Sequence, residues 1–75
     1  MGEIQREGKL LLALRKQYQG SLIYRYKEFF IVKEKNMDTR NYEFHLFGIS
    51  LMPGFVCTFP SERMALNFVN QALRG

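Results

Sequence analysis

The stretch GFVCTFPSERMALNFVNQAL, residues 54–73, decides the fold because it joins a short alternating strand to an amphipathic helix. Its first large residues recur at every second position, as they do on one face of a pleated strand: Phe55, Cys57 and Phe59. Ser61 can cap the following helix by accepting a hydrogen bond from a free backbone N–H group. The stretch therefore predicts a strand over residues 55–59 and a helix over about residues 61–73.

A helix and a long strand are predicted before this stretch. Leucines recur at helical spacing over about residues 9–19, and Gly20 suits the left-handed position that often ends a helix. Gly8 has a low helix propensity, so we expect residues 3–7 to be frayed or only loosely helical. After Gly20 the apolar period changes to two, which predicts a strand over about residues 22–34.

This long strand contains four consecutive apolar residues, Phe29 to Val32, that break its alternation. Either a bulge near Lys27 and Glu28 resets the register or the strand is covered on both sides there. A turn at Lys27 and Glu28 would divide the strand in two. Neither residue is the Gly, Asn or Asp that tight hairpin turns prefer. We therefore favour one long bent strand.

The middle of the chain predicts a hairpin. Residues 34–41 are polar and include Asn and Asp, which stabilise turns through their own side chains, so they should form an exposed loop. A second alternating segment predicts a strand over about residues 42–51. Pro53 and Gly54 then predict a turn, because proline presets one central dihedral and glycine tolerates a positive one.

The predicted order of elements is α-β-β-β-α, in a single small domain spanning residues 1–75. Three consecutive antiparallel strands form a meander, and helices that pack on one face of such a sheet give an α+β fold of two layers. We expect both helices on the same face. A chain of 75 residues is near the lower limit for one self-sufficient hydrophobic core, so every element has to share it.

The composition is typical of a folded domain. Apolar residues make up 47% of the chain, unlike a disordered protein, and no apolar run approaches the roughly 20 residues of a membrane span. A single cysteine cannot form an intramolecular disulfide, which favours a reducing compartment. We therefore expect a cytoplasmic protein that does not bind membranes. The net charge of +4 favours anionic partners without identifying one.

Residues that carry enzyme chemistry are few, since His45 is the only histidine and Cys57 the only cysteine. Cys57 shares its predicted face with two phenylalanines and is expected to be buried. His45 beside Glu43 is expected on the solvent-facing side of its strand. One His and one Cys supply half of a tetrahedral zinc site, and the glycines form no phosphate-binding loop. We predict a protein that is not an enzyme and uses no metal or cofactor.

The first functional hypothesis is protein binding. Apolar residues occur at both parities of the predicted strands, which is more than helices on one face would cover. An exposed apolar patch of that kind is typical of an interaction site. The candidate interface residues are Phe29, Ile31, Phe47 and Ile49. The simplest case is homodimerisation through an edge strand or the open sheet face.

The second hypothesis is nucleic-acid binding, because tyrosines beside basic residues can combine base stacking with phosphate contacts. The candidate residues are Tyr24, Arg25, Tyr26, Lys27, Lys33, Lys35 and Arg40. A third hypothesis is a phage or mobile-element inhibitor that occupies the surface of a host protein. The two-sided hydrophobicity of the strands places a protein partner, including a second copy of the chain, slightly ahead of nucleic acid.

Overall fold

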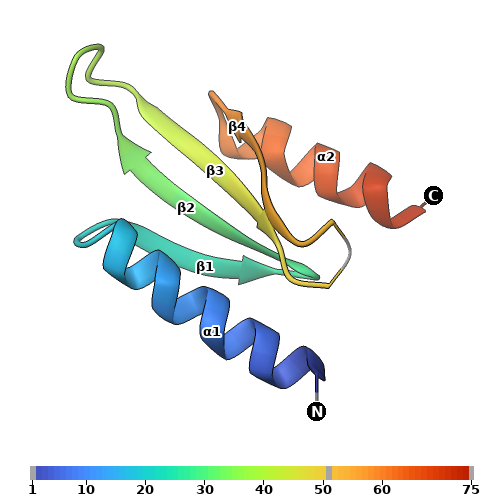
Figure 1. Ribbon diagram of the computed structural model, residues 1–75. Coiled ribbons are helices and arrows are strands. Elements are labelled where there is room, and N and C mark those ends of the chain that lie inside the picture. Colours follow the sequence, from blue (N-terminus) through green and yellow to red (C-terminus); the bar gives the residue numbers. More distant parts are fainter. Residues whose placement is uncertain (1, 51, 75) are drawn as a thin grey trace.

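The computed structural model describes residues 2–50 and 52–74, which form two helices and a four-stranded antiparallel sheet (Figure 1). The strands lie in sequence order, β1-β2-β3-β4. This confirms the predicted α+β class and the antiparallel meander, with one strand more than expected. In chain order the elements are α1 (Gly2–Gln17), β1 (Leu22–Tyr26), β2 (Phe29–Lys35), β3 (Tyr42–Gly48), β4 (Gly54–Phe59) and α2 (Glu62–Arg74).

The additional strand arises from a turn at Lys27 and Glu28, where the sequence favoured one long bent strand. Lys27 adopts a φ of 54°, the left-handed conformation that hairpin turns ordinarily assign to glycine or asparagine. The Arg25 Nε group donates to the Lys27 carbonyl oxygen at 2.8 Å and helps to hold the turn. The prediction of a single strand was wrong because Lys27 adopts the left-handed conformation, and the sequence at this turn has none of the residues (Gly, Asn or Asp) that usually indicate such a turn.

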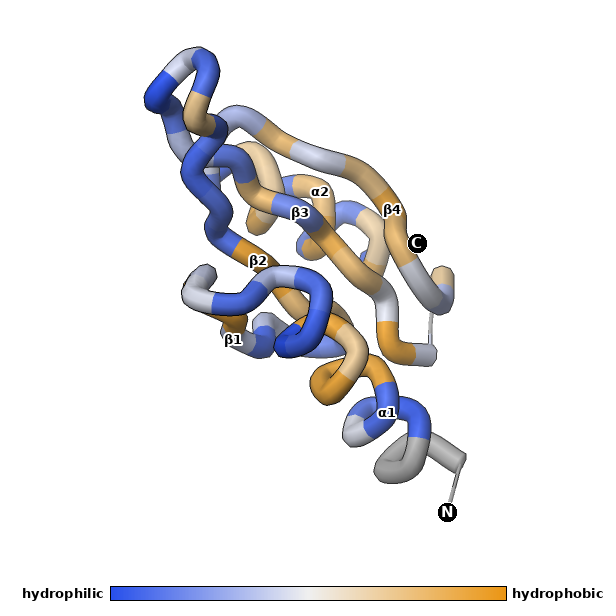
Figure 2. The backbone as a smooth tube through the Cα atoms, turned by 60° about the vertical axis from the view of Figure 1, so that its left-hand side comes forward, coloured by the Kyte–Doolittle hydropathy of each residue, from blue (hydrophilic) through white to orange (hydrophobic). Residues whose placement is uncertain are grey.

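The two helices lie on opposite faces of the sheet, and not on one face as predicted (Figures 1 and 2). The reason lies in β2, whose first four residues are apolar at both parities and buried. Each face of this strand needs its own cover. The molecule therefore has three layers, with the sheet between α1 and α2.

Two separate cores result. The α1-side core consists of Leu14, Phe30, Val32, Phe47 and Ile49. The α2-side core consists of Phe29, Ile31, Phe44, Leu46, Ala65 and Val69. Both cores draw on β2 and β3, so these two strands are the structural centre of the domain.

The helix boundaries follow local chemistry. The structure extends α1 to Gly2, through Gly8 and the residues predicted to fray, and Gly20 follows its end with a φ of 82°. At the start of α2 the Ser61 Oγ atom accepts a hydrogen bond from the Met64 N–H group at 3.3 Å, which confirms the predicted cap. Neither helix, over the residues described, is long and apolar enough to cross a membrane.

The third and fourth strands differ from the alternating pattern read in the sequence. β3 ends at Gly48, before the predicted end at Leu51, which lies outside the described residues. Between β3 and β4 the register shifts at a bulge, so that Leu46 lies opposite Cys57 but Phe47 lies opposite Phe55. The extra residue in β4 turns Phe55 toward the α1 side of the sheet, away from the face expected for this strand.

Candidate functional site

A polar cluster lies on the α1 side of the sheet, at the end of β2 and β3 nearest their connecting hairpin. The residues at this end of the two strands are mostly hydrophilic (Figure 2). The centre of the cluster is His45 in β3, which pairs with Val32 of the α1-side core on one side and with Thr58 on the other. Cross-strand partners share a face, so the imidazole lies on the side of α1. His45 is only 9% exposed.

Three neighbouring side chains orient the imidazole. Its Nδ1 atom lies 2.8 Å from the Thr58 Oγ1 atom in β4, and its Nε2 atom lies 3.0 Å from the Glu34 Oε1 atom in β2. The ring stacks on Tyr18, with 5.3 Å between ring centroids. A carboxylate only accepts, so the neutral imidazole donates from Nε2 to Glu34 and accepts the Thr58 hydroxyl proton at Nδ1.

Two carboxylates face each other beside the histidine. Glu34 and Glu43 are direct cross-strand partners, and their oxygens and a ring nitrogen of His45 all lie within 4.8 Å of one another. The Asn36 Nδ2 group donates to the Glu43 Oε2 atom at 3.3 Å. Burial, followed by the negative charge of Glu34, raises the pKa of Tyr18 above its ordinary value. The region is therefore acidic in character, although the whole chain is basic.

We call these five residues, Tyr18, Glu34, Glu43, His45 and Thr58, the His45 cluster. Two hydrogen bonds link the Thr58 hydroxyl, the His45 imidazole and the Glu34 carboxylate in series, and such a series can carry a proton between its ends. Glu34, Glu43 and His45 also offer three donor atoms of the kinds that hold a metal ion.

The sequence misplaced both of the residues considered for chemistry. His45 is buried and bonded at both ring nitrogens, because Tyr18 from the end of α1 covers the face expected to meet solvent. Cys57 is exposed on the outer strand β4, where the sequence predicted burial. The bulge beside it breaks the simple alternation on which that prediction rested.

The tyrosines proposed to stack on nucleic-acid bases are engaged with α2. Tyr24 donates its hydroxyl proton to Glu62, and Tyr26 donates to the Asn70 Oδ1 atom at 3.1 Å. Both rings also pack partly buried against the α2-side core. Neither offers a free aromatic face of the kind that stacking on bases requires.

The basic candidates do not converge on one surface. Arg25 pairs with Glu7 at 2.5 Å and lies on the α1 side, opposite to the two tyrosines. Lys27 donates to Asn70 of α2 at 2.5 Å. Lys35 lies at the exposed end of β2, and Arg40 lies in the exposed hairpin loop.

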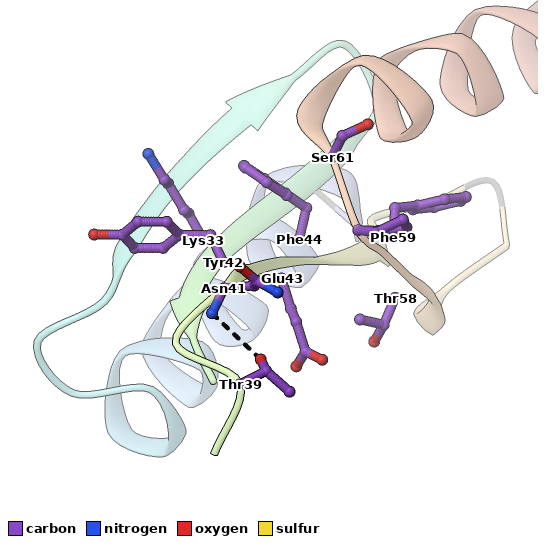
Figure 3. Close-up of a pocket in the computed structure, with 10 residues that line it drawn as sticks. Lys33, Thr39, Asn41, Tyr42, Glu43, Phe44, Thr58, Phe59 and Ser61 are labelled. Atoms are coloured by element: carbon purple, nitrogen blue, oxygen red, sulfur yellow. Dashed lines mark hydrogen bonds between the residues drawn. The ribbon is translucent and has the colours of Figure 1, made fainter. Parts of the chain in front are cut away.

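Lys33 lies beside a hollow of about 630 Å³ between the hairpin and the start of α2 (Figure 3). Its ammonium group lies 4.5 Å from the centre of the Tyr42 ring and 6.0 Å from that of Phe44. In Figure 3, Glu43 and Thr58 extend to the side of β3 opposite to Phe44. The hollow thus touches the His45 cluster at one rim and the lysine at the other.

The four apolar residues proposed as an interface are not on the surface. Phe29 and Ile31 belong to the α2-side core, and Phe47 and Ile49 belong to the α1-side core. The predicted patch is corrected because α1 and α2 cover both sides of the sheet. The large apolar residues that remain exposed among those described are Leu12, Leu22, Met37, Tyr42, Met52, Phe55, Met64 and Leu73.

The outer strand β4 is the apolar edge of the sheet. Residues 53–60 contain no charged side chain, and within them Phe55 is 60% exposed and Cys57 is also exposed. The other outer strand, β1, carries Arg25 with its acidic partner Glu7. On the described surface, the His45 cluster stands out by its two carboxylates beside an imidazole, and the β4 edge by its lack of charge.

No protein-family model, no curated protein and no solved structure matches this chain.

Proposed function

We propose that the chain is a protein-binding domain that associates with a second copy of itself through the β4 edge. The β4 strands of two copies would pair antiparallel and join two four-stranded sheets into one. The observation that carries the proposal is an outer strand without charge that exposes Phe55 and Cys57. The role is binding without catalysis.

The backbone of β4 supplies the attraction. A strand at the edge of a sheet has outward N–H and C=O groups without a strand partner, and natural proteins ordinarily protect such edges with charged residues or proline. Here prolines stand only at the two ends of the segment, at positions 53 and 60, which leaves Gly54–Phe59 for pairing. Main-chain hydrogen bonds between two such edges give affinity, and exposed side chains add to it.

Charge makes β4 the edge at which a second copy can bind. The chain carries a net charge of +4, so two copies repel each other over most approaches. β4 brings no charge of its own to a self-contact, whereas β1 would bring Arg25 against its own copy. A two-fold axis makes the contact self-complementary and closes the assembly at a dimer.

A reducing, cytoplasmic environment fits this arrangement. Cys57 is the only cysteine and lies exposed on the proposed contact strand. In an oxidising compartment two such thiols held close together would form an intermolecular disulfide. Reversible association therefore belongs to a compartment that keeps thiols reduced.

The oligomeric state tests the proposal. We expect sedimentation equilibrium to give a dimer for the parent chain and a monomer for Cys57→Arg, which places two like charges at the contact. Leu12→Arg, at a similarly exposed apolar residue on α1, is the matched control and should remain dimeric. Circular dichroism would establish that both variants are folded. A parent chain that stays monomeric as its concentration rises would overturn the proposal.

Cys57 also reports the geometry of the contact. A two-fold axis perpendicular to the sheet places one residue opposite its own copy, and the registers with the greatest overlap of Gly54–Phe59 put that residue at Val56 or Cys57. In either register the two Cys57 Cα atoms lie within about 8 Å, from the rise per residue and the spacing of strands. A short bis-maleimide should therefore cross-link the dimer, and Leu12→Cys in a Cys57→Ser background should not be cross-linked.

A further inference from the structure

We infer that Glu34, Glu43 and His45 bind a divalent zinc-class metal ion on the α1 side of the hairpin formed by β2 and β3. None of these three residues belongs to β4, the strand of the proposed dimer contact. The site uses one nitrogen and two carboxylate groups, whose donor atoms all lie within 4.8 Å of one another. Because zinc bonds to nitrogen and oxygen are about 2 Å long, binding would draw the two glutamate side chains slightly closer to the imidazole around one ion.

The register of the sheet forces the two carboxylates together. Glu34 and Glu43 are direct cross-strand partners, an arrangement in which like charges destabilise a sheet. Strand alternation turns the neighbouring Lys33 to the other face, over the rings of Tyr42 and Phe44. Within residues 2–50 and 52–74, no Lys or Arg side chain pairs with either carboxylate. A dication would replace this repulsion with attraction to both groups.

The imidazole is already held as a ligand. His45 is only 9% exposed, and its ring is fixed by stacking on the ring of Tyr18. With Nδ1 anchored by Thr58, the Nε2 atom is the one directed at the carboxylates. On metal binding the Nε2 proton would leave, Nδ1 would take a proton, and the Thr58 hydroxyl would accept from it. Metal-bound histidines ordinarily donate their other ring N–H to a partner of this kind.

The donor set selects the class of metal. Calcium and magnesium prefer oxygen ligands alone, whereas an imidazole with carboxylates suits zinc and its neighbours in the first transition row. Three protein ligands leave one position of a tetrahedral zinc ion for water or a further ligand. The Asn36 side chain, which donates to Glu43, would steady that carboxylate from outside.

Because the chain has one histidine, a single imidazole reports on the site. Zinc would be titrated into a Cys57→Ser variant, which removes the thiol as a competing ligand, and the ring nitrogens would be followed by long-range nitrogen–proton NMR. We expect the Nε2 signal to take the shift of a metal-bound nitrogen and Nδ1 to become the protonated one. An unchanged imidazole at saturating zinc would overturn the inference.

Ligand variants make the test specific. Glu34→Gln combined with Glu43→Gln should weaken zinc binding by at least about tenfold, on the scale seen when groups around a metal are removed. Asp38→Asn, an exposed carboxylate in the hairpin loop outside the cluster, is the control and should bind as the parent does. Equal affinity in the double variant and the control would place the zinc elsewhere and overturn the assignment. Backbone amide spectra would establish that each variant is folded.

Discussion

Phe55 of the edge strand lies directly opposite Phe47, and their rings meet edge to face with centroids 5.5 Å apart. Phe47 is buried in the α1-side core, whereas Phe55 keeps most of its ring exposed. The inner ring therefore holds the outer one in place without covering it. An aromatic ring so oriented is presented at little further cost in side-chain entropy, as is favourable for a binding residue.

Replacing Phe55 with serine should separate the dimer while leaving the fold intact. Loss of the aromatic pair should lower the free energy of unfolding of the monomer by only about 1 kcal/mol. Leu12→Ser removes an equally exposed apolar side chain from α1 and should keep the dimer. Sedimentation and urea denaturation would measure the two effects separately. A Phe55→Ser variant that remains dimeric would locate the contact away from β4.

The two cores should contribute comparably to stability. Leu14 and Leu46 are the same residue type, nearly or fully buried, one in each core. Each substitution by alanine should lower the free energy of unfolding by about 3 kcal/mol, because it removes buried methyl groups and leaves a cavity. Urea denaturation followed by circular dichroism would measure both. A cost below about 1 kcal/mol for Leu14→Ala would mean that α1 is not an integral layer.

Two glycines should respond to alanine with opposite signs. A Cβ atom at Gly20 or at Gly8 would meet no other atom within 4 Å, so space is equal at both sites. Gly20 has a φ of 82°, and alanine there should destabilise the fold by about 1 kcal/mol or more. Gly8 lies inside α1, where alanine should stabilise by about 0.5–1 kcal/mol. Thermal denaturation of the two variants would check both signs, and equal shifts would contradict the backbone argument.

Alkaline pH should weaken the fold partly through Tyr24. Burial first, and then the hydrogen bond and negative charge of Glu62, raise the pKa of Tyr24 above its ordinary value near 10. The folded state thus retains a proton that the unfolded state loses, so this stabilisation is complete below about pH 10 and declines as pH rises further. Tyr24→Phe should reduce the slope of unfolding free energy against pH in that range. Tyr18, whose pKa is also raised, would leave a residual slope. An unchanged slope in the variant would show that Tyr24 makes no such contribution.

Most of the elements could be predicted from the periodicity of apolar residues and from the residue types at turns and caps. The cap at Ser61, the helix after it and the polar hairpin loop all follow from local chemistry. The turn at Lys27 could not be predicted, because its left-handed conformation is held by surrounding structure and not by residue type. The four consecutive apolar residues from Phe29 to Val32 did carry the signal for a sheet covered on both sides. The same residues also suited an exposed interface, and only the positions of the two helices decide between cover and exposure.

The His45 cluster depends on information that a sequence does not state directly. Glu43 and His45 share a face by alternation, but Glu34 joins them only through the register between β2 and β3. The hairpin sets that register, with backbone hydrogen bonds between Asn36 and Asn41 and between Arg40 and Asn36. The cover provided by Tyr18 depends further on which face α1 occupies. Both are tertiary facts, so the cluster appears only in the folded chain.

The two-faced character of β2 has a consequence for how the chain finds its native state. In most half-buried strands a slip by one residue would expose the apolar set and is penalised at once. In β2 the same slip would move Phe29 and Ile31 to the α1 side of the sheet and Phe30 and Val32 to the α2 side, and both faces of the strand would remain apolar. Hydrophobic burial therefore does not distinguish the native register of β2 from one shifted by a residue. The native register depends instead on the turns at either end of the strand, where substitutions should raise the yield of misaligned chains more than they change the free energy of the native state.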